Sequence, residues 1–272
     1  MKKIFFHVGL AKTGTTYLQH KFFPKLKGIK YIQRTKYRQF KYVKIIKKTD
    51  YNTYLISNEF DRQLEQEVNN IASVYPHAQI IMVLRRHDYW IASQYKRRIK
   101  NGYSFTFSEF IDLENDQGFW KQKDLSFYPM IKMIEDKFKS KPLILFYSDL
   151  RKDPYLFLEK IARFIGADFD KKSIDLSPKH RSFNEKQLKI IRKFSRFLFS
   201  QDFEYSDKYW VSKIQRLFRM IPRYFILFVS LAAPNFLVPK PPLIAEKELE
   251  KVRKHYEDDW NKCLEYASAS KN

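Results

Sequence analysis

The chain has 272 residues, 44% of them hydrophobic and 17% aromatic, and its formal net charge is +22. This much apolar material is enough for a sizeable core, which excludes a disordered or low-complexity chain. The single cysteine, Cys263, excludes an intrachain disulfide framework and a cysteine cluster for a metal, and no pair among the six histidines has the spacing of a helical zinc motif.

Short apolar runs alternate with helical patterns over most of the chain, which predicts an α/β fold with a parallel central sheet. Strands are predicted at Lys3–Val8, Ile29–Gln33, Thr53–Ser57, Gln79–Leu84 and Pro142–Tyr147. Helices are predicted at Thr15–Phe23, Tyr37–Lys48, Asp61–Tyr75, Asp88–Asn101, Phe127–Phe138 and Pro154–Ile165, with Gly166 as the C-cap of the last. After about residue 184 the pattern is helical only and ends in Ala245–Ala267. We expect a single domain over residues 1–272, with an α/β core at 1–183 and a C-terminal helical extension at 184–272.

Two apolar runs are candidates for targeting or membrane segments. The run Ile4–Ala11 contains His7 and is followed by Lys12 instead of a cleavage site, so a buried strand is expected there and not a signal peptide. The run 224–239 has 16 uncharged residues and contains Pro234, so it is too short to span a bilayer. We expect a cytoplasmic protein that contacts the inner membrane surface peripherally through 224–239.

Basic residues gather in two stretches. Lys21–Asp50 holds eleven Lys or Arg and one acid, and Lys179–Arg196 holds seven Lys or Arg and one acid. Such stretches indicate either an anionic partner or a solvated, lysine-rich surface.

The loop after the first strand has the composition of an anion cradle. Gly9 and Gly14 are two of only six glycines, and they enclose Lys12 and Thr13 before Thr15 and Thr16 open a helix. Backbone N–H groups and the helix dipole favour an anion there, and a lysine adds a full charge. The order of residues departs from the nucleotide-triphosphate P-loop, because Thr15 stands where that motif has lysine. The alternative is a glycine turn that binds no ligand.

The segment Lys12-Thr13-Gly14-Thr15-Thr16 resembles the 5′-phosphosulfate-binding loop of sulfotransferases, which use 3′-phosphoadenosine-5′-phosphosulfate (PAPS) on a three-layer, P-loop-kinase-like fold. Arg85 at a strand end and Ser93 eight residues later resemble the family's 3′-phosphate site, although His87 stands where a proline is common. The segments Leu143–Gly166 and Tyr256–Asn261 are also similar to family segments, the second to bacterial carbohydrate sulfotransferases. Asp149 and Asp153 in the first of these segments are expected to have structural roles.

The resemblance implies further site residues. A general base follows a core strand in this family, and Glu59 after Thr53–Ser57 has that place, with His20, His87 and His7 as weaker rivals. Arg181 in the late basic stretch is expected to reach the donor's 3′-phosphate. The predicted site is therefore Lys12 and Glu59 as catalytic residues and Lys12, Thr13, Gly14, Thr15, Thr16, Arg85, Ser93 and Arg181 around the donor, without a metal.

The resemblance implies sulfuryl transfer from PAPS to a hydroxyl or amine of a carbohydrate, such as a surface or capsular polysaccharide. In this scheme Lys12 neutralises the charge that develops on the leaving phosphate. Two other classes stay open: a nucleotide kinase on the same fold, and a non-enzymatic basic module that binds nucleic acid or membrane, for which the sequence offers no nucleic-acid motif.

Overall fold

The structure is a computed structural model, and it describes residues 2–177, 183–198 and 206–269. Its contacts divide the chain into two compact units. The first comprises Met1–Arg86, Lys123–Lys179 and Tyr256–Asn272, and the second comprises His87–Gln122 and His180–His255. The units therefore cross the boundary expected at residue 183, because segments 87–122 and 256–272 each belong with residues far away in the sequence.

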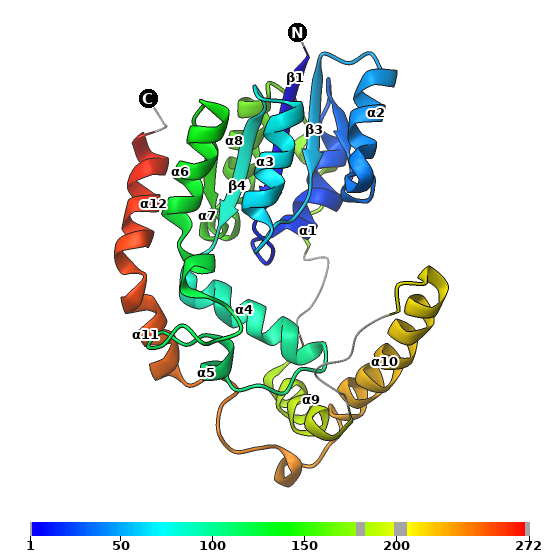
Figure 1. Cartoon of the computed structure of the whole chain (residues 1–272), viewed down its shortest axis with the longest axis vertical. Coiled ribbons are helices and arrows are strands. Elements are labelled where there is room, and N and C mark those ends of the chain that lie inside the picture. The colour runs from blue at the N-terminus through cyan, green and yellow to red at the C-terminus, as the bar shows by residue number, and fades with distance from the viewer. Residues whose placement is uncertain (1, 178–182, 199–205, 270–272) are drawn as a thin grey trace. The chain divides into compact units, whose positions relative to one another are not determined.

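The first unit contains a five-stranded parallel sheet with the order β2-β3-β1-β4-β5 (Figure 1). Its strands are β1 (Lys3–Gly9), β2 (Lys30–Ile32), β3 (Thr53–Ser57), β4 (Gln79–Leu84) and β5 (Leu143–Phe146). Its helices are α1 (Thr15–Tyr17), α2 (Lys41–Lys48), α3 (Leu64–Val74), α6 (Phe127–Phe138), α7 (Tyr147–Lys152), α8 (Pro154–Ile165) and α12 (Glu257–Ala269). The prediction of an α/β fold with a parallel central sheet is confirmed.

Both faces of the sheet are covered, which makes the first unit three layers deep. On one face, Phe5, Leu55 and Val83 of the strands pack with Phe22 and with Leu158 of α8. The strand residues of alternating position are also buried and point to the other face. Strands that are buried on both faces are expected of a parallel sheet between helical layers.

The topology places the carboxyl end of β1 at a switch point. From β1 the chain first adds β2 and β3 on one side and then β4 and β5 on the other. Loops at such a point are the usual place for a ligand in a parallel α/β sheet.

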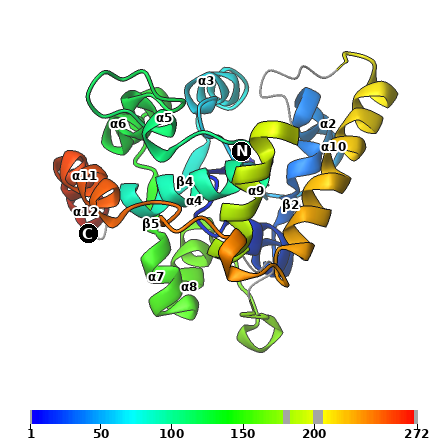
Figure 2. The same ribbon diagram turned by 90° about the horizontal axis from the view of Figure 1, so that it is seen from below.

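The second unit is helical. Its helices are α4 (His87–Lys100), α5 (Phe107–Phe110), α9 (Glu185–Leu198), α10 (Tyr209–Val229) and α11 (Glu246–His255). Helix α9 contacts both α4 and α10, and Figure 2 shows α9 and α10 side by side. Trp90 and Trp120 meet edge to face in its core, with ring centroids 5.0 Å apart.

Most predicted elements are confirmed, and α6 and α8 have the predicted bounds. Gly166 caps α8 in the left-handed conformation with φ 73°, as predicted. The predicted strand Pro142–Tyr147 is shorter because Tyr147 begins α7. The predicted helix Tyr37–Lys48 starts at Lys41, because Gln39 and Phe40 have positive φ.

Two predicted helices are divided. The stretch predicted as Thr15–Phe23 is α-helical over Thr15–Tyr17 and then π-helical over Leu18–Phe22. The predicted helix Ala245–Ala267 breaks at Tyr256 into α11 and α12, which belong to different units. Asp259 of α12 accepts hydrogen bonds from the first backbone N–H groups of α6, which ties α12 to the first unit.

Candidate active site

The loop after β1, residues 9–16, is called the β1 loop below, and it is held by contacts from β4 and from the segments that follow β3 and β4. The Leu10 N–H donates to the Val83 carbonyl at 3.1 Å, and the Ala11 N–H donates to the Asp61 carboxylate at 3.1 Å. The Arg85 guanidinium donates to the Lys12 carbonyl at 3.4 Å. These bonds fix the path of the backbone around Lys12 before any ligand is present.

Gly14 starts α1 in a conformation that side chains rarely adopt, with φ 88°. A Cβ atom there would lie 2.7 Å from Leu150 Cδ2 and 3.3 Å from the Tyr147 ring. The turn therefore packs directly against α7, and the absence of a side chain at position 14 lets the helix start approach it.

The threonines of the β1 loop differ in their surroundings. The Thr13 hydroxyl is buried and donates to the Leu10 carbonyl at 2.6 Å, which braces the loop from inside. Thr15 is also buried, whereas Thr16 is half-buried and lines a cavity. Of the three threonines, Thr16 is therefore the one that borders the cavity.

Arg85 leaves β4 and reaches the β1 loop. Its guanidinium carbon lies 5.0 Å from the centre of the Tyr147 ring, in addition to its bond to the Lys12 carbonyl. A guanidinium held by an aromatic face and a carbonyl is a preorganised donor for an anionic group. The structure brings the Arg85 guanidinium to the backbone of Lys12, and the predicted role of Arg85 at the donor's 3′-phosphate stays a prediction.

Two of the predicted donor residues, Ser93 and Arg181, are not part of these contacts of the β1 loop in the described residues. Ser93 is half-buried on α4 in the second unit, and its pairing with Arg85 stays a prediction. Arg181 lies outside the described residues.

Glu59 lies beside the β1 loop. The chain after β3 continues along β1, since the Phe60 N–H donates to the Val8 carbonyl at 3.0 Å. A Cβ atom on Gly9 would be 3.4 Å from the Glu59 Cα atom. The Glu59 side chain is 13% exposed, and its Oε1 lies 3.7 Å from Arg34 Nη1. The carboxylate that the sequence singles out is therefore held next to the loop that contains Lys12.

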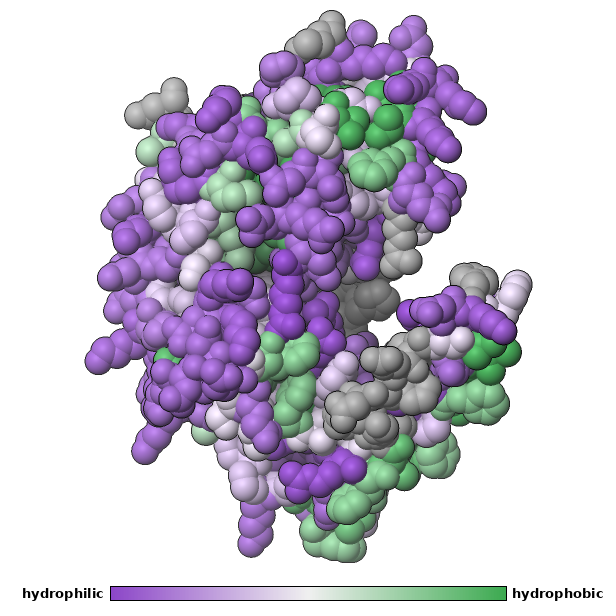
Figure 3. Space-filling model, in the orientation of Figure 1, coloured by the Kyte–Doolittle hydropathy of each residue, from purple (hydrophilic) through white to green (hydrophobic). Residues whose placement is uncertain are grey.

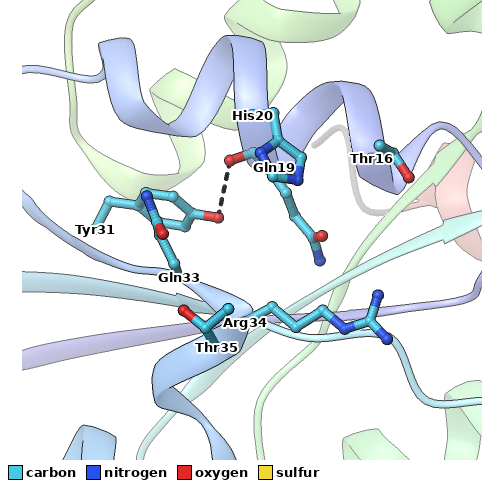
Figure 4. A pocket seen from close by; sticks show the side chains of 7 residues that line it. All are labelled: Thr16, Gln19, His20, Tyr31, Gln33, Arg34 and Thr35. Carbon is cyan, nitrogen blue, oxygen red and sulfur yellow. Dashed lines mark hydrogen bonds between the residues drawn. The ribbon is translucent and has the colours of Figure 1, made fainter. Parts of the chain in front are cut away.

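A cavity of about 520 Å³ opens between the β1 loop and the segment after β2 (Figure 4). Seven residues line it, and each has a polar group in its side chain: Thr16, Gln19, His20, Tyr31, Gln33, Arg34 and Thr35. The Tyr31 hydroxyl donates to the Gln19 carbonyl at 3.1 Å, and Figure 4 shows the Gln19 amide and the Arg34 guanidinium facing the same space. The cavity thus has the β1 loop at one side and the ion-pair partner of Glu59 at the other.

The histidine rivals of Glu59 differ in accessibility. His7 is fully buried in the first unit, and burial lowers its pKa to about 3, so it is neutral at physiological pH. His7 Nδ1 and the Ser57 hydroxyl form a hydrogen bond of 2.8 Å, and the Gln19 amide donates to the same hydroxyl at 3.0 Å. His87 is buried in the second unit. His20 is exposed and lines the cavity.

A second groove runs along the outside of β2. Its volume is about 690 Å³, and five lysines line it together with Tyr31, Ile32, Gln33, Ile45 and Thr49: Lys30, Lys36, Lys41, Lys44 and Lys48. Tyr31 and Gln33 belong to both linings, so the groove adjoins the cavity. The basic stretch seen in the sequence is therefore concentrated at one edge of the sheet.

Sequence reasoning missed Arg34, Gln19 and Gln33. Arg34 stands directly after the predicted strand Ile29–Gln33, so its place at a strand's carboxyl end was available as a signal. Gln19 lies inside a predicted helix and gives no local signal. Within the described part of the chain, no group of three or more His, Cys, Asp or Glu side chains is arranged to hold a metal ion.

The profile of the family described as "Sulfotransferase domain" matches residues 3–209 of this chain. No curated protein matches the chain. Among solved structures, a sulfotransferase from Alicyclobacillus acidocaldarius is similar, with 12% identity, a TM-score of 0.51, and coverage of 86% of this chain and 97% of that chain. A mouse sulfotransferase in complex with PAP has 14% identity and a TM-score of 0.38, covering 64% of this chain and 62% of that chain. Because the family profile spans most of the chain, including the β1 loop, Glu59 and Arg85, the chain belongs to the sulfotransferases, enzymes of P-loop-kinase-like fold that use PAPS as donor.

Proposed function

We propose that this enzyme transfers a sulfuryl group from PAPS to a hydroxyl or amine of a carbohydrate, such as a surface or capsular polysaccharide. The observation that carries the proposal is the cavity between Thr16 of the β1 loop and Arg34, the ion-pair partner of Glu59. An acceptor in this cavity would have the donor loop on one side and a carboxylate base close by.

The β1 loop fits the phosphosulfate end of the donor. Its glycine turn lets the start of α1 pack against α7, and Arg85 is held at the same loop. Lys12 and the backbone N–H groups of residues 13–16 would bind the 5′-phosphosulfate. The buried Thr13 and Thr15 would act by shaping the loop, and Thr16 by contact. Arg85, with Ser93 and Arg181, would bind the 3′-phosphate.

The transfer step balances with the residues named. Glu59 accepts the proton of the acceptor hydroxyl as its oxygen forms a bond to sulfur. The bond between sulfur and the bridging phosphate oxygen breaks, and adenosine 3′,5′-bisphosphate leaves with the electron pair. Lys12 stabilises the negative charge that develops on that leaving phosphate, as preorganised cations do in acyl and phosphoryl transfer.

The lysine-lined groove supports an anionic polysaccharide as acceptor. It adjoins the cavity through Tyr31 and Gln33, and its five lysines attract negative charge along the path of a long chain. A glycan bound along β2 would place one sugar in the cavity and its neighbours over the lysines.

The first experiment is a thermal shift of the full chain with adenosine 3′,5′-bisphosphate, ATP plus Mg²⁺, and 5′-AMP. A ligand at about 100 times its Kd stabilises a protein by about 2.7 kcal/mol, which is readily measured. Stabilisation by the bisphosphate alone supports a donor site with a 3′-phosphate pocket. Stabilisation by ATP alone favours a nucleotide kinase, and no shift with any of the three favours a basic binding module.

The second experiment tests the acceptor. Transfer of ³⁵S from labelled PAPS is measured with acidic and neutral polysaccharides of matched length at low and high salt. Transfer to acidic chains that weakens at high salt supports the lysine-lined groove as the acceptor path, because salt screens exposed charges. Equal transfer to neutral chains contradicts it.

A further inference from the structure

Helix α10 presents an apolar face to solvent. At intervals of three and four residues its sequence places the exposed side chains Trp210, Ile214, Leu217, Phe218, Ile221, Phe225 and Phe228. Residues so spaced share one face of a helix. The side chain of Phe218, the most exposed of these, is 72% exposed. Figure 3 shows hydrophobic residues gathered on the surface over α10 at the lower right.

The other face of α10 packs within the second unit and is mixed, since it bears polar residues and also the fully buried Leu227. Gln215 and Arg219 on this face are half-buried, and Ser230 just past the helix end is buried. The Arg223 guanidinium donates to the Asn101 carbonyl, and the Gln187 amide of α9 donates to the Leu227 carbonyl at 2.8 Å. Most of the large apolar side chains of α10 therefore face solvent, whereas a surface helix normally turns its apolar stripe to the core.

Other exposed aromatic residues of the second unit flank α10. Phe197 near the end of α9 is 80% exposed, and Phe236, in the turn after α10, is 84% exposed. A monomer in water rarely exposes so many large apolar side chains, so this surface is expected to be covered by a partner.

The charges of α9 and α10 identify the kind of partner. Helix α10 contains no acidic residue, and its Lys213 and Arg216 are exposed, whereas Arg219 and Arg223 lie on the packed face. Helix α9 adds five Lys or Arg against Glu185. A cationic helix with a wide apolar face, aromatic residues and no acid binds the surface of an anionic bilayer. A second copy of the chain is a poor partner for this surface, because two proteins of charge +22 repel each other.

We infer that α10 lies in the interface of an anionic phospholipid membrane, with the face of Phe218 and Phe225 inserted among the lipids. This deepens the proposed peripheral contact of residues 224–239 and extends it over the whole of α10. Within the described residues, no helix is long and apolar enough to cross a membrane. At this surface the enzyme would act on lipid-linked or membrane-bound acceptors; this last step rests on the proposed function.

The test is co-flotation of the full chain with vesicles of phosphatidylcholine alone and of phosphatidylcholine with phosphatidylglycerol. The full chain is expected to float with the anionic vesicles and to bind the neutral ones more weakly. Phe218→Asp and Phe225→Asp are each expected to reduce binding at least about tenfold, because each removes an inserted aromatic ring and adds a repelled charge. Leu156→Asp, at an exposed leucine of α8 in the first unit, is the matched control and is expected to bind like the unchanged protein.

Three outcomes would overturn the inference: no binding to either vesicle, unreduced binding of both Asp variants, or equal loss in the Leu156→Asp control. Concentration-dependent self-association that disappears in Phe218→Asp would assign the surface to a second copy instead. Stabilisation by adenosine 3′,5′-bisphosphate is measured on the same samples. Since it reports on the donor site and flotation reports on α10, failure of the proposed function and failure of this inference are distinguishable.

Discussion

Glu59 and Arg34 form an ion pair across two neighbouring strand ends, with 3.7 Å between Oε1 and Nη1. Glu59 follows β3 and Arg34 follows β2, and these strands are adjacent and parallel. The carboxylate is largely shielded, whereas the Arg34 side chain is more than half exposed and lines the cavity. Arg34 therefore links the Glu59 carboxylate to the cavity that is proposed to take the acceptor.

Glu59→Gln is expected to lower sulfuryl transfer by about a hundredfold or more, because the amide cannot accept the acceptor's proton. Stabilisation by adenosine 3′,5′-bisphosphate should be unchanged, since Glu59 is assigned to the acceptor side. The measurement is ³⁵S transfer beside a thermal shift. Glu65→Gln, at an exposed position of α3, is the control with the same charge change. Wild-type transfer by Glu59→Gln would move the role of base to His20.

Substitution of Lys12 and substitution of Arg85 are expected to affect different steps, turnover in the first case and donor binding in the second. Lys12→Ala should lose turnover by roughly two orders of magnitude while it keeps part of its donor affinity, because its charge matters most in the transition state. Arg85→Ala should weaken binding of adenosine 3′,5′-bisphosphate by about tenfold or more, because it removes a forked donor to phosphate. Titration calorimetry and initial rates separate the two effects. Lys25→Ala, an exposed lysine outside the site, should change neither. The same loss pattern in both variants would refute this division of roles.

Gly14→Ala should damage the β1 loop more than Gly28→Ala damages its own turn. Both glycines have positive φ, 88° and 77°, so an alanine at either position is strained by about 1 kcal/mol. A Cβ atom at position 14 also meets Leu150 and Tyr147, whereas nothing lies within 4 Å of one at position 28. Urea unfolding should show the larger loss of stability for Gly14→Ala, and that variant alone should lose binding of adenosine 3′,5′-bisphosphate. Equal effects would mean that contact with α7 does not shape the loop.

His7 should make the protein less stable in mild acid. Burial lowers its pKa from 6.5 to about 3, so below pH 6.5 the unfolded chain binds a proton that the folded chain does not. Stability that is present above pH 6.5 is therefore lost as the pH falls, by roughly 2 kcal/mol between pH 6.5 and pH 5. In His7→Asn this contribution to the pH dependence of the unfolding free energy should disappear. His77→Asn, at an exposed position, should keep it. An unchanged pH dependence in His7→Asn would contradict the assignment.

Strong local patterns made much of the fold predictable. The runs of β1, β3 and β4 and the amphipathic helices α6 and α8 appear where their periodicity places them, since each has a continuous apolar set to bury. The β1 loop could also be predicted as an anion-binding loop, because glycine, lysine and threonine together after a strand are a distinctive combination. Arg85 and Glu59 were named from the resemblance to sulfotransferases, and both follow strands whose carboxyl ends a parallel sheet brings to one edge.

Other features depend on residues that are far apart in the sequence. Arg34 became part of the site because β2 pairs with β3, and Gln19 because its amide reaches Ser57. The break at Tyr256 and the grouping of 87–122 with 180–255 depend on which surfaces bury each other, and helical periodicity does not record this. The run 224–239 was visible as apolar, but the outward apolar face of α10 was not, since a helical pattern shows that a face exists and packing shows which face is buried. The chemistry of short segments could be determined from the sequence alone, because it depends on neighbouring residues. Which faces are buried and which strands pair became known only from the tertiary structure, because these depend on residues far apart in the chain.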